Sequence, residues 1–183
     1  MFKSRLWILA ALITLTTLAV AQQDSMQAGG KKPPLSPPGQ AMLTFADGNT
    51  VTIDYSRPSM RGRKIYGGLV PWEQVWRTGA NAATSLKTSV ALNIGGTNVP
   101  AGSYTLYTLP SASSWTLIIN KQTGQWGTNY DQAQDLARIP MKVSQLPSGL
   151  ETFTISLDKT SGNSATLKLD WELTSASVSI KEK

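Results

Sequence analysis

The chain has 183 residues, 40% of them hydrophobic and 15% charged, which suits one buried core and argues against a protein built of charged helices. The formal net charge is +6, and without Lys3 and Arg5 it falls to +4, because 15 Lys and Arg then face 11 Asp and Glu. Histidine and cysteine are absent, which excludes disulfides, Ser-His-Asp and Cys-His nucleophilic sites and ordinary zinc sites. We expect no metal ion and no cofactor.

The first residues have the pattern of a secretory signal peptide. A basic start, Met1 to Arg5, precedes an apolar run from Leu6 to Val20, and Ala19-Val20-Ala21 is a small-x-small cleavage pattern. The run is shorter than the roughly 20 residues that span a bilayer. We therefore predict a signal peptide over residues 1–21 and a secreted or periplasmic protein that meets the membrane only during export.

Residues 22–39 are polar and proline-rich, a composition that favours an extended spacer over a packed element. We predict a disordered spacer there, followed by a single β domain over residues 40–183. Thr, Ser and Gly are frequent in that domain, and apolar residues alternate with polar ones in short runs bounded by turn signals. The predicted strands lie within residues 41–45, 51–55, 85–94, 97–99, 103–109, 115–120, 153–157 and 165–173.

Two Gly-containing turns, Asp47-Gly48 and Gly95-Gly96, indicate hairpins. Only residues 130–138 have a helical pattern, with Ala133 and Ala137 on one side and Arg138 at the end. Many short strands, regular turns and one short helix predict an all-β fold, an antiparallel β-sandwich or jelly-roll, with a partly closed barrel as the alternative.

One long connection, Tyr55 to Thr84, has weak strand character. It contains four arginines and several aromatic residues but a single acid, Glu73. Long irregular connections in compact domains are usually functional or packed by their own side chains. The arginines of this connection are Arg57, Arg61, Arg63 and Arg77, and the aromatic residues are Tyr66, Trp72 and Trp76.

Three interpretations of this connection remain open. The arginines converge on an anion, which a guanidinium binds well. Alternatively they are structural, and bond to loop carbonyls or to acids such as Asp54, Asp131 or Asp135. In the third interpretation, the aromatic rings form a platform for a sugar, with Arg77 and Asn81 as hydrogen-bond donors.

The chain contains the sequence motifs Tyr55-Ser56-Arg57-Pro58, Gly62 to Gly67, and Trp76-Arg77-Thr78-Gly79-Ala80-Asn81. It also contains the motifs Val99 to Leu106 and Gln125-Trp126-Gly127. These five motifs are similar to those of the family called domain of unknown function 2911. The resemblance covers Ala41 to about Leu173. It implies an exported bacterial domain of β character, and it carries no assigned activity and no catalytic residue.

Trp126 lies in a loop flanked by glycines, and it is a candidate for a second wall of the ligand-binding site. If this loop meets the Arg-rich connection, Arg77, Asn81, Trp126 and Asp131 line one pocket. The full set of candidate ligand-binding residues is Arg57, Arg61, Arg63, Tyr66, Trp76, Arg77, Asn81, Trp126 and Asp131.

The leading hypothesis is a binding or envelope-structural module whose Arg- and Trp-rich site takes a small anionic or carbohydrate-like ligand. One alternative is a carbohydrate-active enzyme that uses the carboxyl groups of Glu73 or Asp131. The other is a pure structural scaffold. We expect no nucleic-acid partner, because the basic residues cluster in one loop without a recognised binding fold. The oligomeric state is left open.

Overall fold

The computed structural model describes residues 34–183, so the predicted signal peptide and residues 22–33 of the predicted spacer lie outside the described part of the chain. The described residues form strands joined by turns, with one turn of 3-10 helix between β7 and β8. The strands are β1 (Pro38–Thr44), β2 (Thr50–Ser56), β3 (Thr84–Thr88), β4 (Leu92–Ile94), β5 (Thr97–Val99), β6 (Gly102–Pro110), β7 (Trp115–Asn120), β8 (Asp135–Ser161) and β9 (Ser164–Glu182).

These strands form one antiparallel sheet in the order β1-β2-β3-β6-β7-β8-β9-β4-β5. The long strand β8 belongs to both halves of the sheet, because its residues 135–141 pair with β7 and its residues 142–161 pair with β9. Register shifts interrupt the second part on both sides of Leu150. Pro147, which lacks an amide donor, and Gly149 lie in this interrupted stretch, where strands commonly bend.

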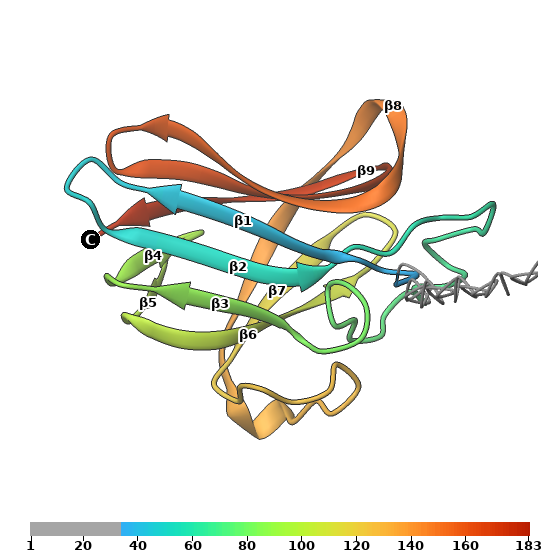
Figure 1. Ribbon diagram of the computed structural model, residues 1–183, viewed down its shortest axis with the longest axis horizontal. Helices are drawn as coiled ribbons and strands as arrows, with labels where there is room; N and C mark the ends of the chain where they lie inside the picture. Colours follow the sequence, from blue (N-terminus) through green and yellow to red (C-terminus); the bar gives the residue numbers. More distant parts are fainter. Residues whose placement is uncertain (1–33) are drawn as a thin grey trace, which may run out of the picture. The chain divides into compact units, whose positions relative to one another are not determined.

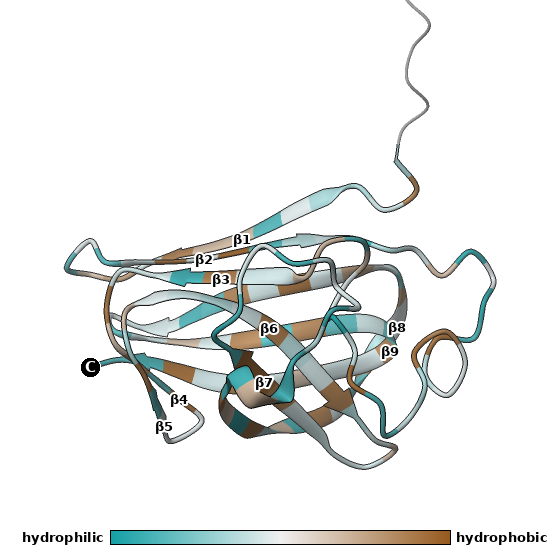
Figure 2. Ribbon diagram, turned by 90° about the horizontal axis from the view of Figure 1, so that it is seen from below, coloured by the Kyte–Doolittle hydropathy of each residue, from teal (hydrophilic) through white to brown (hydrophobic). Residues whose placement is uncertain are grey.

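The sheet folds back on itself, so that β8 and β9 lie across the hydrophobic core from β1, β2 and β3 (Figure 1). Tyr55 of β2 contacts Phe153 of β8, with ring centroids 5.7 Å apart, and the Tyr55 hydroxyl accepts a hydrogen bond from the Ile155 amide at 2.9 Å. Figure 2 shows hydrophobic positions along the strands between polar ones. The buried positions with period two include Val51, Ile53 and Tyr55 in β2 and Leu167, Leu169 and Trp171 in β9.

The expected all-β, antiparallel character is confirmed. The strands form a single continuous sheet, and the classification as a sandwich or jelly-roll stays a prediction. In the described residues, no helix is long and apolar enough to cross a bilayer.

The predicted helix over residues 130–138 is wrong. Only residues Gln132–Gln134 form a 3-10 turn, which Asp131 caps by accepting from the Ala133 amide at 2.9 Å. From Asp135 onward the chain is strand, because residues 135–141 pair with β7 and their inward side chains recur every second residue. In the sequence, a short alternating run that contains alanine resembles one face of a helix.

The ordered domain begins earlier than residue 40. β1 starts at Pro38, and the Arg57 amide donates to the Pro37 carbonyl at 2.8 Å, which extends the pairing beyond the strand. The run predicted as one strand over residues 85–94 is divided into β3 and β4, because β3 pairs with β2 and β6 whereas β4 pairs with β9 and β5. The connection over residues 57–83 is irregular, as expected.

Candidate functional site

The Arg-rich connection, residues 57–83, is joined to β6 at Trp76. The Trp76 amide donates to the Thr108 carbonyl at 2.7 Å, and the Thr108 amide donates back to the Trp76 carbonyl at 2.9 Å. This reciprocal pair is the hydrogen-bonded unit of an antiparallel ladder. It fixes the point from which the next residue, Arg77, leaves the sheet.

A strained turn carries Arg77, and we call residues 76–81 the Gly79 turn. The φ angles of Thr78, Gly79 and Asn81 are 53°, 154° and 61°. A positive φ is unusual for a β-branched residue such as Thr78. The buried Thr84 hydroxyl holds it in place by donating to the Thr78 carbonyl at 2.7 Å. Strained backbone concentrates at functional sites, so this turn is a candidate for one.

The Trp76 indole lies in the aromatic core beneath the Gly79 turn. It stacks on Trp171, with ring centroids 5.9 Å apart and 18° between the planes, and its Nε1 donates to the Gly79 carbonyl at 3.2 Å. Trp115 and Phe153 contact it edge-on. These contacts leave the indole little freedom to rotate, so it forms a rigid wall.

The Gly127 loop, residues 121–130, lies beside the Gly79 turn. The Gly127 amide donates to the Asn81 carbonyl at 3.1 Å, and the Ala83 amide donates to the Gln125 carbonyl at 3.3 Å. The two segments singled out in the sequence are therefore in contact, although they are far apart along the chain.

Gly127 also touches Arg77 directly. A Cβ atom at residue 127 would lie 2.2 Å from Arg77 Cδ and 2.7 Å from the Asn81 carbonyl oxygen. Gly127 has no positive φ, so its backbone conformation suits other residues as well. The glycine is needed because the Arg77 side chain passes directly over the backbone of the loop.

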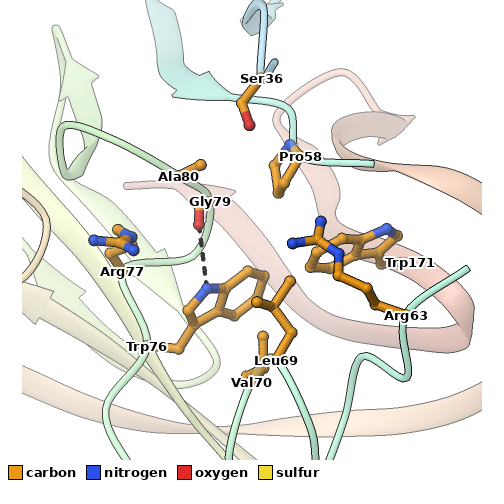
Figure 3. A pocket seen from close by; sticks show the side chains of 10 residues that line it. All are labelled: Ser36, Pro58, Arg63, Leu69, Val70, Trp76, Arg77, Gly79, Ala80 and Trp171. Carbon is orange, nitrogen blue, oxygen red and sulfur yellow. Dashed lines mark hydrogen bonds between the residues drawn. The ribbon is translucent and has the colours of Figure 1, made fainter. Parts of the chain in front are cut away.

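Two cavities border Trp76 and Arg77. Cavity A has a volume of about 220 Å³ and lies among residues that include Pro58, Arg63, Leu69 and Trp171. Figure 3 shows Arg63 and Arg77 on opposite sides of Trp76 in this cavity. Cavity B has a volume of about 200 Å³, and its walls are Val75, Trp76, Arg77, Tyr107, Gly127, Thr128 and Tyr130.

Tyr107 is a fixed wall of cavity B. Its side chain is 1% exposed, its hydroxyl accepts from Gln125 Nε2 at 3.0 Å, and it donates to the Asn129 carbonyl at 3.4 Å. Burial raises the pKa of the Tyr107 phenol, while the hydrogen bond from Gln125 and the nearby charge of Arg77 act in the opposite direction. Tyr107 therefore stays neutral at ordinary pH and keeps its proton available for donation.

Tyr130 forms the adjoining wall, and its ring packs edge-on against that of Tyr107, with the ring centroids 4.9 Å apart. The Tyr130 hydroxyl donates to Asp135 Oδ2 at 2.7 Å and accepts from Arg138 Nη2 at 2.7 Å. Burial and the bond to Asp135 raise the pKa of Tyr130 to about 12. The Asn120 side chain holds the other oxygen of Asp135 at 2.9 Å, so this carboxylate has its partners.

Arg77 differs from Asp135 in having no such partners among the described residues. Within residues 34–183 its guanidinium makes no hydrogen bond and no ion pair, and its Nε is buried. The nearby carboxylate of Asp135 is occupied by Tyr130, Arg138 and Asn120. A buried donor on a charged group is costly when it is unpaired, so such groups normally have a partner.

The other three arginines of the connection bond to the protein itself. Arg57 Nη2 donates to Thr154 Oγ1 at 3.1 Å. Arg61 Nη2 donates to the Leu35 carbonyl at 3.0 Å. Arg63 Nε and Nη2 donate to the carbonyls of Met60 and Ser59 at 2.9 and 2.7 Å. The structural interpretation therefore describes these three arginines, and none of their guanidinium groups forms an ion pair within residues 34–183.

Of the remaining candidates, Tyr66 is buried in the aromatic core, stacked on Trp72 at 5.7 Å. Its hydroxyl has no partner among the described residues, and burial raises the pKa of the Tyr66 phenol above its ordinary value. Asn81 is exposed and contributes its backbone carbonyl to Gly127. Trp126 is 54% exposed. None of these three lines cavity A or cavity B.

The acidic candidates also lie outside the cavities. Asp131 caps the 3-10 turn, and Glu73 is exposed with its amide bonded to the Pro110 carbonyl at 2.9 Å. Neither residue lines cavity A or cavity B. The structure therefore brings Trp76 and Arg77 together at both cavities and Arg63 to cavity A, and it distributes the other six candidates around them.

Sequence reasoning missed Tyr107, Tyr130, Val75 and Thr128. Tyr107 belongs to a run of consecutive buried residues, 104–108, which has no alternation to mark one face. The one available signal was Tyr130, whose position close after Trp126-Gly127 placed it in the same loop.

In residues 34–183, no group of three or more His, Cys, Asp and Glu side chains is placed to hold a metal ion. In comparisons with known proteins, the family model described as "Protein of unknown function (DUF2911)" matches residues 36–180. A search of curated proteins and a search of solved structures each found no match.

Proposed function

The chain belongs to the DUF2911 family, and we propose that this member is a binding module that holds a small anionic ligand on Arg77. The export predicted from residues 1–21 is part of the proposal, so the ligand would be met outside the cytoplasm.

The observation that carries the proposal is the contrast among the four arginines. Arg57, Arg61 and Arg63 donate to protein oxygens, whereas Arg77 has no acceptor in the described residues and borders two cavities. A guanidinium presents a planar set of donors that suits carboxylate, phosphate or sulfate. An anion in either cavity would supply the acceptor that Arg77 lacks.

The surroundings of Arg77 support a site that exists before the ligand arrives. The Gly79 turn is held in a strained conformation, and the Gly127 loop is bonded to it. Preformed donors bind more tightly than flexible ones, because less ordering accompanies binding. The strain in this turn is therefore a cost that a binding role would explain.

The test is anion binding to the purified protein, measured by calorimetry and thermal shift with acetate, benzoate, phosphate and sulfate. Sodium chloride at equal ionic strength controls for screening. We expect at least one anion to raise the melting temperature of the wild type, and Arg77→Gln to abolish the effect. Arg61→Gln, which removes an exposed guanidinium elsewhere on the connection, is the matched control and should retain binding.

Binding that survives Arg77→Gln, or no binding of any of the four anions, contradicts the proposal. In that case the cluster is a packed corner of a scaffold.

A further inference from the structure

We propose that the ligand of Arg77 is a small aromatic carboxylate that lies in cavity B, an inference that rests on the proposed function and narrows its ligand class. Cavity B is preferred to cavity A because of what its walls present. Its lining includes the guanidinium of Arg77, which has no partner within residues 34–183, and the other large side chains are the rings of Trp76, Tyr107 and Tyr130.

The residues that line cavity B include side-chain donors and no carboxylate, the donors being Arg77 and the hydroxyl groups of Tyr107 and Thr128. Arg77 is the charged donor. The Tyr107 hydroxyl already accepts from Gln125 Nε2, and its own proton has only the distant Asn129 carbonyl, 3.4 Å away. That proton is available to a better acceptor. A guanidinium and a phenol on the same cavity together suit the two oxygens of a carboxylate.

The rest of the cavity has few groups for further ligand oxygens. The Tyr130 hydroxyl is occupied by Asp135 and Arg138, and Val75 and Trp76 present apolar surface. A sugar would bury hydroxyl groups against these walls without partners, and a phosphate would place multiply charged oxygens against the apolar ring faces. A flat apolar body avoids both costs and packs against the rings.

The volume of cavity B agrees with a ligand of about one ring. At about 200 Å³ it is smaller than the roughly 300 Å³ at which pockets for drug-sized molecules begin. It is several times the roughly 30 Å³ that a water molecule occupies in the liquid. Benzoate is therefore a suitable probe, since it combines one carboxylate with one ring.

The experiment compares benzoate with three probes by calorimetry on the purified protein. Acetate has the charge without the ring, benzyl alcohol has the ring without the charge, and phosphate is a different anion. We expect benzoate to bind about tenfold or more tightly than acetate and benzyl alcohol, because only benzoate satisfies both ends of the cavity. Phosphate should bind more weakly than benzoate.

Variants locate the ligand. Val75→Phe narrows cavity B alone and should weaken benzoate binding about tenfold. Leu69→Phe changes a residue that lines cavity A alone, and it is the matched control, with benzoate affinity retained. Tyr107→Phe removes the second donor and should weaken benzoate more than benzyl alcohol. Circular dichroism checks that each variant is folded.

The outcomes separate this inference from the proposed function. If acetate or phosphate binds as tightly as benzoate and depends on Arg77, the aromatic class is wrong and the anion site stands. If Leu69→Phe weakens benzoate and Val75→Phe does not, the ligand lies in cavity A and this inference is overturned. If no anion depends on Arg77, the proposed function itself fails.

Discussion

At the scale of single residues, the account depends on the different surroundings of similar side chains. Four arginines in one connection look equivalent in the sequence, yet three bond to protein oxygens, whereas Arg77 bonds to none in the described part of the chain. The same contrast applies to tyrosines, since Tyr130 is bonded to a carboxylate and Tyr107 to an amide. The role of each of these side chains is therefore inferred from its hydrogen-bond partners and not from its residue type.

The first prediction concerns stability without ligand. Arg77→Met should leave the free energy of unfolding within about 0.5 kcal/mol of the wild type or raise it, because the substitution removes an unpaired buried donor and keeps an apolar stem. Arg57→Met should lower it by about 1–2 kcal/mol, because the hydrogen bond to Thr154 is lost. Urea denaturation measures both. Equal losses in the two variants would show that Arg77 is structural.

The second prediction concerns high pH. The pKa of Tyr130 is raised from 10.0 to about 12 in the folded protein, so between these values the folded state holds a proton that the unfolded state loses. The resulting stabilisation is complete below pH 10 and is lost as the pH rises through 12. Tyr130→Phe should show a smaller loss of stability over this range. Tyrosinate absorbance during the titration checks it, and ionisation of all five tyrosines near pH 10 would contradict it.

At the scale of elements, the sequence predicted local features such as turns better than contacts between segments that are far apart in the chain. The hairpins at Asp47-Gly48 and Gly95-Gly96 follow from turn residues between apolar runs, and the structure has both. The contact of Gly127 with Arg77 was beyond prediction, because it depends on how two distant loops pair.

The helix predicted over residues 130–138 failed for a related reason. Ala133 and Ala137 suit a helix by themselves, and the pairing of residues 135–141 with β7 overrides that preference. Tyr107, a wall of cavity B, was missed because burial on both faces of a strand leaves no periodic signal. Tyr130, another wall, lies in the Gly127 loop, which has no periodic pattern. Arg77 and Trp76 were candidates from the sequence, and their ligand role stays a prediction.

The third prediction tests the contact between the Gly79 turn and the Gly127 loop. Gly127→Ala should lower the free energy of unfolding by about 1–3 kcal/mol, because the new methyl group would lie 2.2 Å from Arg77 Cδ and 2.7 Å from a carbonyl oxygen. It should also weaken anion binding, since Arg77 is displaced. Gly149→Ala is the matched control, as its methyl group would have only one neighbour, at 4.0 Å. Similar thermal stability of the two variants would contradict the close contact.

At the scale of the whole molecule, the candidate site lies where the Arg-rich connection packs against β8 and β9. Trp171 of β9 is fully buried, stacks on Trp76 of the connection, and donates to the Glu151 carbonyl of β8 at 3.1 Å. The core is one contiguous cluster that contains residues from both halves of the sheet. We therefore expect the residues from 34 onward to unfold as one cooperative unit.

The fourth prediction tests this unity with two tryptophans. Trp171→Ala should lower the free energy of unfolding by about 3–5 kcal/mol, with fluorescence and circular dichroism still reporting a single transition. Trp126→Ala removes a ring that is 54% exposed and should change stability by no more than about 0.5 kcal/mol. Two separate transitions in either protein would mean that the halves of the sheet fold independently.

The central claim is that the guanidinium of Arg77 lacks an acceptor among residues 34–183 and receives one from an anion. Its most direct test is a nitrogen–proton NMR spectrum of the arginine Nε–H groups, assigned with Arg77→Lys and followed during addition of benzoate and then of acetate. The Arg77 signal should shift and saturate, while those of Arg57 and Arg63, which donate to the carbonyls of Phe153 and Met60, stay in place. An unmoved Arg77 signal, or a common shift of all three, would contradict the account.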